Sequence, residues 1–436
     1  GSSIIKAPDS GSTGVTFTMP ASTGTLLTTT GSAASLTAIP AANITGTLPA
    51  IDGSSLTGIT GSSDYRPSGK PIIINGDMAI AQRSTSVASL GNGDSGYHTV
   101  DRWNYSEPTA GHQTSVSVWT QTQETLTSGD AWEDGFTKAL KMDCTTADAS
   151  LSGADDAAFI EYKIEGADVK AFKKGTPNAQ PYTLSFWVKA TKTGTNCVNL
   201  FDRTNDRYIA AAYTISTTNT WEKKVINFAA DTTGSIAAGT WYQGENGEGM
   251  KLTFGVYAGT NYTSSSLQTS WGSATTAARF VGQVNNSDST SNNWHITGVQ
   301  LEVGTYTAAT LPPFQHENYG DSLARCQRYY YMHANGNSKP IGIGFYYSGA
   351  YCAAQIHFPT TMRASPSIED VVGTGYYSLS RAGGGDSFDG FANEAVSENG
   401  VQIYVNSGTV NASTNGDAGR LHTANSSAQI AFTAEL

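Results

Sequence analysis

ITGVQLEVGTYTAATLPPFQHENYGDSLARCQRYYY, residues 296–331, is the stretch that decides the fold. It begins with apolar and polar residues that alternate up to Val303, which is the pattern of a half-buried β-strand. Pro312 and Pro313 then end any regular element, because proline has no N–H to donate and restricts the residue before it. A short helical pattern follows the prolines. The stretch therefore predicts that one β-domain ends here and that a linker helix opens a second domain.

The strand at the start of this stretch changes phase. Its apolar side chains form two sets of opposite parity on either side of Gly298: Trp294 and Ile296, then Val299, Leu301 and Val303. A β-bulge inserts one extra residue, and glycine tolerates the backbone conformation that a bulge needs. A bulge at Gly298 would return all five side chains to the core, and the sequence predicts one there.

The linker helix is predicted from Asp321, which can cap its first turn, and from Leu323, Cys326 and Tyr330 at i, i+3 and i+7. Strands are predicted on both sides of the helix, since β-branched and aromatic residues alternate there between turn residues. The clearest runs are 182–189, 223–228 and 251–257 before the helix, and 341–347, 351–358, 401–405 and 429–433 after it. This pattern is typical of an all-β protein.

The composition agrees with an all-β chain and excludes several function classes. Only 14% of the 436 residues are charged and 47 are glycine, which favours strands joined by small-residue turns. The formal charge of −11 contains no basic stripe, so neither nucleic acid nor an anionic membrane is an expected partner. No apolar run approaches the ~20 residues that span a bilayer. Wide spacing favours buried thiols over disulfides or metal ligands at Cys144, Cys197, Cys326 and Cys352.

Residues 1–64 differ from the rest of the chain. About half of them are Gly, Ser or Thr, and they contain neither Trp nor Tyr. A monomer could not bury enough apolar area here to offset the entropy of ordering, which costs roughly 1–2 kcal/mol per residue. Repeats such as ITG at 44–46 and LTG at 56–58 place isolated Ile and Leu among small residues, which suits chains wound round one another. The sequence predicts a multi-chain shaft, with a disordered linker as the alternative.

With its parts in this order, the sequence resembles the C-terminal parts of bacteriophage tail fibres. ITGTLPAIDGSSLTGI resembles the repeat that leads into many fibre tips. IINGDMAIAQRSTS followed by DRWNY resembles the opening of their carbohydrate-binding-module-like jelly roll, and YTLSFWVKA and ITGVQLEVG resemble its middle and closing strands. LARCQRYY and HFPTTMRASPSI resemble the small domain that often follows, so that the resemblance covers nearly the whole chain.

The resemblance implies a trimeric fibre with a thin shaft, a jelly-roll β-sandwich middle domain and a smaller C-terminal β-sandwich tip. The three domains would be residues 1–64, 65–316 and 317–436. The chain departs from the family after QLE, where a longer TYTAATLPPFQ replaces the usual G-x-x-A-T-P-F-E, so a role for an acidic residue at position 315 is not carried over. Since the chain opens without methionine, we expect an upstream region that joins other virion tail proteins.

The implied function is attachment of the virion, through a homotrimeric tail fibre, to a glycan on the bacterial surface. Three weak sites on one trimer would gain from effective concentration. Two alternatives stay open: a depolymerase fibre that cleaves polysaccharide, and a structural or decoration fibre of the virion head. We expect no enzymatic activity, because carboxylate pairs such as Glu133-Asp134 and Asp155-Asp156 do not set the opposed ~5–10 Å geometry of glycoside hydrolysis.

Sugar binding needs exposed aromatic faces, flanked by side chains that pair with hydroxyl groups. Two loops of the middle domain have that composition. Their candidate residues are Trp241, Tyr242, Gln243, Glu245 and Asn246 in the first loop, and Asn261, Tyr262, Gln268 and Trp271 in the second. In the tip, loop-like segments at 373–377 and 381–389 add Tyr376 and Tyr377. The alternative is that these aromatic residues cover a core edge or a subunit interface.

Jelly-roll binding modules often hold a structural calcium, which takes carboxylate and carbonyl oxygens as ligands. Asp77, in an Asn-Gly-Asp turn, and Glu302 of the closing strand are the candidate ligands. An ordinary turn with a surface carboxylate is the simpler interpretation. Arg102 is expected to be structural, either stacked on an aromatic ring or paired with Asp77 or Asp101.

Overall fold

The computed structural model describes residues 70–91, 93–107, 114–151, 153–233, 246–348, 351–409 and 415–436. The predicted shaft at 1–64 lies outside the described residues, and so do Trp241, Tyr242, Gln243 and Glu245. All described residues belong to one compact unit, Thr60–Leu436. Within the described ranges, no helix is long and apolar enough to cross a bilayer.

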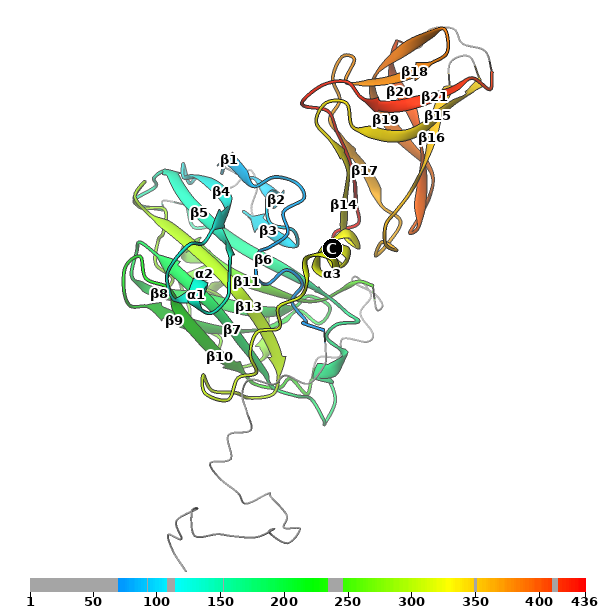
Figure 1. Ribbon diagram of the computed structural model, residues 1–436. Coiled ribbons are helices and arrows are strands. Elements are labelled where there is room, and N and C mark those ends of the chain that lie inside the picture. The colour runs from blue at the N-terminus through cyan, green and yellow to red at the C-terminus, as the bar shows by residue number, and fades with distance from the viewer. Residues whose placement is uncertain are drawn as a thin grey trace, which may run out of the picture. The chain divides into compact units, whose positions relative to one another are not determined.

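Two antiparallel sheets form a β-sandwich in the first part of this unit (Figure 1). The six-stranded sheet has the order β1-β4-β5-β13-β7-β10, and the seven-stranded sheet has the order β12-β9-β8-β11-β6-β3-β2. The strands of the first are β1 (Ser86–Leu90), β4 (Val118–Thr125), β5 (Lys138–Thr146), β7 (Tyr182–Ala190), β10 (Glu222–Phe228) and β13 (Asn293–Val303). Those of the second are β2 (Ser95–Tyr97), β3 (Trp103–Ser106), β6 (Ala157–Glu165), β8 (Gly194–Asp202), β9 (Arg207–Ile215), β11 (Glu248–Ala258) and β12 (Gly272–Ser273). The connections contain α1 (Asp130–Glu133), η4 (Lys170–Phe172), α2 (Thr260–Thr263) and η5 (Thr276–Ala278).

The sandwich core is built around large aromatic side chains from both sheets. Trp103 of β3 and Phe254 of β11 belong to the seven-stranded sheet, while Phe186 of β7 and Trp294 of β13 belong to the six-stranded sheet. The ring centroid of Phe254 lies 5.0 Å from that of Phe186 and 6.0 Å from that of Trp294. All four side chains are fully buried. The predicted alternation explains this core, because every second residue of a strand faces the opposite sheet.

The predicted bulge at Gly298 is confirmed. The register between β13 and β7 shifts between Thr297 and Gln300, and Gly298 has a φ of 61°. The shift turns the second apolar set back toward the core. Of the five predicted inward side chains, four are buried and the last is partly buried: Trp294, Ile296, Val299 and Leu301, then Val303.

The linker helix α3 (Tyr319–Gln327) lies where the sequence predicts a helix, but its ends differ. The capping residue is Asn318, whose side-chain oxygen accepts a hydrogen bond from the Asp321 N–H at 2.9 Å. Asp321 is instead a first-turn carboxylate. The prediction that Tyr330 lies on the helix is also wrong, since the helix ends before it and Tyr330 opens the next strand.

Beyond α3 the chain forms a small sheet and a closed barrel (Figure 1). The small sheet has the order β14-β22-β17, with β14 (Tyr330–Asn335), β17 (Ser367–Asp370) and β22 (Gln429–Thr433). The barrel has the order β15-β16-β20-β19-β18-β21, with β15 (Pro340–Ser348), β16 (Tyr351–His357), β18 (Tyr377–Arg381), β19 (Gly384–Ser397), β20 (Gly400–Thr409) and β21 (Ala418–Thr423). The predicted second sandwich is therefore corrected to a barrel, because β21 pairs with both β15 and β18 and closes the sheet.

Two other predictions concern boundaries and thiols. The last sandwich strand ends at Val303 and α3 begins at Tyr319, so the predicted boundary at 316 falls between them. The C-terminal part nevertheless contributes to the sandwich core, since Tyr329 belongs to it and Leu436 packs against it. The four cysteines are free and buried, as predicted.

Candidate functional site

The second predicted sugar loop of the sandwich is largely committed to structure. Tyr262 of α2 is buried, and its ring lies edge-on to Phe159 at 5.5 Å, so its face is not available for stacking. The Gln268 side chain donates to the Tyr208 carbonyl oxygen at 3.0 Å. Asn261 is exposed, but its amide donates to the Asp155 carboxylate. In the first loop, only Asn246 is described, and its carbonyl oxygen accepts from Arg363 at 2.7 Å.

Trp271 covers a buried ion cluster instead of standing free. Its indole N–H donates to the Ala229 carbonyl oxygen at 2.8 Å, and Lys174 Nζ lies 5.0 Å from its ring centroid. Lys174 is fully buried between the carboxylates of Asp202 and Asp231, the second at 2.9 Å. Burial opposes ionisation of Asp231, but hydrogen bonds from Arg207 and Lys174 outweigh it and lower its pKa to about 2. The ring is thus a partly buried wall of a structural cluster.

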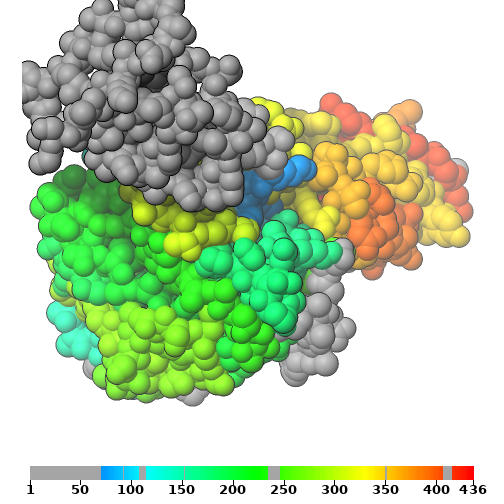
Figure 2. Space-filling model, turned by 90° about the horizontal axis from the view of Figure 1, so that it is seen from below, coloured from blue at the N-terminus to red at the C-terminus, as the bar shows by residue number. Residues whose placement is uncertain are grey.

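The segment between β11 and β13, which contains α2, β12 and η5, covers the outer face of the seven-stranded sheet. Phe280 stacks on Phe159 of β6 at 4.4 Å, and Tyr208 of β9 donates to the Thr275 carbonyl oxygen. Figure 2 shows the segment that follows β11, in lime, on the surface of the sandwich. The core clusters beneath it are closed by its own apolar residues. This face of the sandwich therefore presents no open aromatic surface among the described residues.

The tip residues predicted from loops also prove to be core residues. Tyr377 of β18 is fully buried, and its hydroxyl lies 2.9 and 2.7 Å from the carbonyl oxygens of Val371 and Gln429. Tyr376 is partly buried and packs against the barrel core. The segment 381–389 is no free loop, because it forms the turn and first pairs of the β18–β19 hairpin. The prediction that Tyr377 lies in a loop is wrong because two glycines precede this residue and its strand, β18, begins only at Tyr377.

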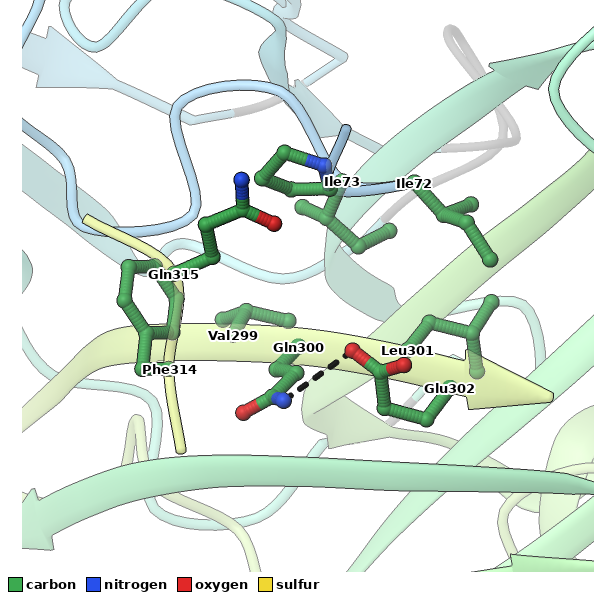
Figure 3. A pocket seen from close by; sticks show the side chains of 9 residues that line it. Ile72, Ile73, Val299, Gln300, Leu301, Glu302, Phe314 and Gln315 are labelled. Atoms are coloured by element: carbon green, nitrogen blue, oxygen red, sulfur yellow. Dashed lines mark hydrogen bonds between the residues drawn. The ribbon is translucent and has the colours of Figure 1, made fainter. Parts of the chain in front are cut away.

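The candidate calcium ligands Asp77 and Glu302 do not fit a shared metal site. The Asp77 carbonyl oxygen lies 3.4 Å from Thr297 Oγ1, and Glu302 is five residues further along β13, about 15 Å at ~3.3 Å per residue. Gln300 donates to Glu302 at 3.0 Å beside a cavity of about 10 Å³, the space of one water (Figure 3). Carboxylates this far apart cannot share one ion. In the described part of the chain, no three His, Cys, Asp or Glu side chains gather to hold a metal.

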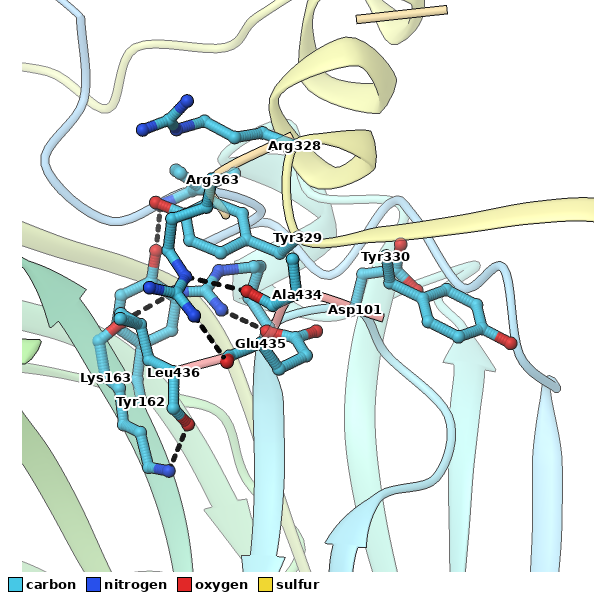
Figure 4. Close-up of polar contacts among 12 residues, drawn as sticks. Asp101, Tyr162, Lys163, Arg328, Tyr329, Tyr330, Arg363, Ala434, Glu435 and Leu436 are labelled. Atoms are coloured by element: carbon cyan, nitrogen blue, oxygen red, sulfur yellow. Dashed lines mark hydrogen bonds and ion pairs between the residues drawn. The ribbon is translucent and has the colours of Figure 1, made fainter. Parts of the chain in front are cut away.

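Arg102 is structural, as predicted, but its partners differ from those expected. Its guanidinium lies over the Tyr329 ring at 3.5 Å, donates to the Lys163 carbonyl oxygen at 2.7 Å and pairs with Glu435. Figure 4 shows these three partners, Lys163, Tyr329 and Glu435, gathered in one place. Neither Asp77 nor Asp101 is its counter-ion. The expected aromatic stacking is confirmed, and the carboxylate comes from the other end of the chain.

Two of the carboxylates considered for hydrolysis, Asp156 and Asp134, have structural partners. Asp156 accepts from the backbone N–H groups of Ser115 and Gly153 at 3.0 and 2.8 Å. Asp134 pairs with Lys223 at 3.1 Å. These contacts give the carboxylates folding roles.

Outward-facing aromatic side chains gather on adjacent strands of the barrel. On β15 the inward Tyr346 is buried, while Phe345 and Tyr347 have the opposite parity. Tyr347 is 76% exposed, the highest value among the large hydrophobic side chains that the structure describes. Tyr351 of β16 and Tyr404 of β20 extend the surface beyond it. We call the following set the barrel aromatic site: Phe345, Tyr347, Tyr351, Glu394, Gln402 and Tyr404.

The rings of this site meet at two angles. The planes of Tyr347 and Tyr351 cross at 72° with centroids 6.1 Å apart, whereas Tyr351 and Tyr404 stack at 13° and 5.1 Å. Tyr347 and Tyr351, together with Phe345, Ser348, Glu394, Ala395 and Gln402, line a groove of about 660 Å³, and Tyr404 stacks on Tyr351 outside that lining. That volume lies within the range of small-ligand sites. The groove offers both a flat surface and a corner to a ligand.

Two polar side chains stand beside the rings. Glu394 accepts hydrogen bonds at one carboxylate oxygen from the Tyr351 hydroxyl and from the Gln402 amide, the second at 3.2 Å. The hydrogen bond to Glu394 raises the pKa of the Tyr351 hydroxyl above its usual value. Ring faces beside a carboxylate and an amide are suited to stacking a sugar ring and pairing with its hydroxyl groups.

Other exposed aromatic side chains lack these features. Trp132 of α1 is 46% exposed and Tyr319 of α3 is 65% exposed. Across the described ranges, neither makes a ring contact with a second aromatic residue, and neither lines a described groove. The barrel aromatic site is therefore the better candidate. Sequence reasoning missed it, although the predicted strands 341–347, 351–358 and 401–405 already place tyrosines on the outward parity.

No protein-family model and no curated protein matches the chain. Several solved structures resemble parts of it. The enzymatically active domain of tailspike protein 4 from bacteriophage CBA120 is 14% identical, with a TM-score of 0.26, over 50% of this chain and 21% of that one. The CBM22-1–GH10 modules of Clostridium thermocellum xylanase 10B, complexed with xylohexaose, are 12% identical, with a TM-score of 0.23, over 51% and 29%.

A third solved structure, TmCBM61 in complex with β-1,4-galactotriose, is 7% identical, with a TM-score of 0.20, over 54% of this chain and 99% of that one. This chain spans about a fifth of the length of the tailspike domain that it matches. Identities and TM-scores this low carry no weight for function, which must be argued from the residues of this chain.

Proposed function

We propose that this chain is the C-terminal part of a bacteriophage tail fibre, which attaches the virion to a glycan on the bacterial surface through the barrel aromatic site. Two independent arguments support the proposal. The order of motifs along the sequence resembles that of tail fibres. The described surface holds a groove whose side chains suit a saccharide.

The observation that carries the proposal is the exposure of Tyr347 within that groove. A tyrosine side chain that is 76% exposed buries little apolar area, so it contributes little to folding stability. Folding alone therefore does not explain why a tyrosine stands at this position. Beside it, Glu394 and Gln402 supply hydrogen-bonding groups on neighbouring strands. Strands hold side chains more rigidly than loops do, which lowers the entropy cost of binding.

The test is a glycan array probed with the purified protein, followed by titration of the best ligand with Tyr347→Ala. Loss of one stacking ring should weaken binding about tenfold at a single site, from the ~0.5–1.5 kcal/mol of an aromatic contact and its lost buried area. Tyr319→Ala is the matched control, since Tyr319 is similarly exposed but lies outside the groove. Equal binding by Tyr347→Ala and the unaltered protein would remove the site from the proposal.

A second readout is attachment to cells. Purified protein should bind intact host bacteria and compete with phage adsorption, while Tyr347→Ala should do so poorly. In a trimer the loss at each site multiplies, so adsorption should fall more steeply than monovalent affinity. Release of reducing sugar from host polysaccharide would point instead to the depolymerase alternative.

A further inference from the structure

The charge of the barrel aromatic site limits what it can bind. Of the residues that line the groove, Glu394 is the charged one, and Phe345, Tyr347, Ser348, Tyr351, Ala395 and Gln402 are neutral. The Lys and Arg residues on the described barrel strands are Arg381 of β18, which pairs with Asp386 and Asp417, and Arg420 of β21, which lies opposite Ile343 of β15. Only β18 lies between β21 and β19 in the closed barrel, but across it Arg420 is level with Gly385, nine residues from Glu394, so Arg420 does not neutralise the carboxylate. The groove is therefore locally negative.

One oxygen of this carboxylate is left for a ligand. Both hydrogen bonds that Glu394 accepts, from Tyr351 and from Gln402, go to Oε2. In the described residues, no donor is recorded for Oε1. The two donors fix the orientation of the carboxylate and leave its second oxygen directed to solvent, where it can accept from a ligand.

The rings add a second attraction of the same sign. An aromatic ring has a negative face, so a cation is drawn to it. Tyr347 and Tyr351 meet edge to face, with planes at 72°, and Tyr347 is 76% exposed, so a ring face is accessible where the two side chains meet. The Tyr351 hydroxyl joins this corner directly to Glu394. Neutral hydroxyl groups would use the carboxylate but would gain little from the corner.

The backbone beside the carboxylate is strained. Ala395 has a φ of 48°, and the pairing of β19 with β20 shifts between Glu394 and Ser397. A residue with a β-carbon in this conformation costs of the order of 1–3 kcal/mol, and such positions cluster at functional sites. Here the strained residue follows Glu394 and lines the same groove.

We propose that the glycan recognised here carries a protonated primary amine, as in an amino sugar without an acetyl group. The ammonium would lie in the corner of Tyr347 and Tyr351 and donate to Glu394, while the sugar ring lies along the stacked rings of Tyr351 and Tyr404. This inference rests on the proposed function and specifies its ligand.

The test compares three probes by NMR titration at pH 6.5: methyl glucosaminide, methyl N-acetylglucosaminide and methyl glucoside. We expect the amine to bind about tenfold more tightly than either neutral sugar, from the summed effect of a cation–π contact and an exposed ion pair. Glu394→Gln should reduce the preference to the part that the cation–π contact supplies, because the ion pair is lost, and should weaken the neutral sugars less than the amine. Glu398→Gln, which alters an exposed carboxylate outside the groove, is the control.

The outcomes separate this inference from the proposed function. Equal affinity for all three probes, with Tyr347→Ala weakening each of them, would overturn the amine and retain the glycan site. A preference for the amine that is undiminished in Glu394→Gln would also overturn it. If tetramethylammonium binds as tightly as the amino sugar, the site recognises the cation alone. That result would contradict a sugar ligand. Binding of none of these probes, or of any array glycan, would count against the proposed function itself.

Discussion

Gly298 determines which side chains of β13 reach the core. Its φ of 61° is accessible to glycine at low cost, and a β-carbon there would lie 2.7 Å from the Phe136 ring. The residue therefore joins two constraints, a left-handed backbone and a close approach of an aromatic ring. Both can be measured separately by substitution.

We predict that Gly298→Ala lowers the free energy of unfolding by about 3 kcal/mol, from backbone strain together with overpacking. Gly383→Ala is the matched control, because Gly383 has a φ of 83° but nothing within 4 Å of an added β-carbon. Strain alone should cost that variant about 1 kcal/mol. Chemical denaturation of both variants measures the two values, and equal losses would contradict the close approach to Phe136.

Asp101 makes folding stability depend on pH. Its carboxylate is buried and accepts from the Gln82 backbone N–H at 2.9 Å, and burial raises its pKa to about 6. The unfolded chain has the ordinary value of 3.8, so the folded state favours the protonated form. The corresponding stabilisation is complete below pH 3.8 and is lost as the pH rises through 6.

We predict that the unfolding free energy of Asp101→Asn, minus that of the unaltered protein, rises by about 2–3 kcal/mol between pH 4 and pH 7. The change with pH isolates ionisation from any constant cost of the amide. Denaturant titrations at several pH values measure the difference. A difference that stays flat, or falls, would show that Asp101 ionises normally in the folded protein.

At the scale of elements, the sequence predicts where the strands lie better than it predicts which strands pair with one another. Alternation located β7, β11, β15 and β22 to within three residues at each end, and the glycine bulge was readable, because these features depend on local patterns. Closure of the barrel could not be predicted from the sequence, because the pairing of β21 with both β15 and β18 joins segments that are far apart along the chain. The barrel aromatic site could not be predicted for a related reason: sugar-binding composition points to loops, whereas the exposed aromatic residues of this site lie on strands.

The buried ion cluster illustrates such a distant dependence. Lys174 and Asp231 come from separate connections and meet Asp202, the last residue of β8, in the interior beside Trp271. In the sequence each is an ordinary charged residue. In the folded chain the three side chains lie together away from water. The cost of burying each charge therefore depends on the presence of the other two.

We predict that Lys174→Met lowers the free energy of unfolding by about 3–5 kcal/mol, because it leaves buried carboxylates without their cation. Lys224→Met is the control. Lys224 pairs with Glu222 at 2.6 Å in a partly exposed position, so its loss should cost about 1 kcal/mol or less. Denaturant unfolding monitored by tryptophan fluorescence compares the two. Similar losses would mean that the cluster near Trp271 is not desolvated as the structure has it.

At the scale of the whole molecule, the composition of the chain also predicts its oligomeric state. Residues 1–64 are too poor in apolar side chains to fold as a monomer, so we predict a homotrimer. Light scattering should give three times the chain mass of 45.8 kDa. Removal of residues 1–64 should lower the mass toward that of one chain. A monodisperse monomer in which residues 20–64 resist protease would contradict the prediction.

The contact between Arg102 and Glu435 bears on how the chain is made. Their positions differ by 333 residues, and the guanidinium is 1% exposed. A ribosome adding ~5–20 residues per second needs roughly 20–70 s to pass from one to the other. Throughout that interval the arginine has no counter-ion, so the nascent sandwich cannot close around it at low cost. Proteolysis of stalled nascent chains would date the closure, which this pairing places after the synthesis of Glu435 and not before it.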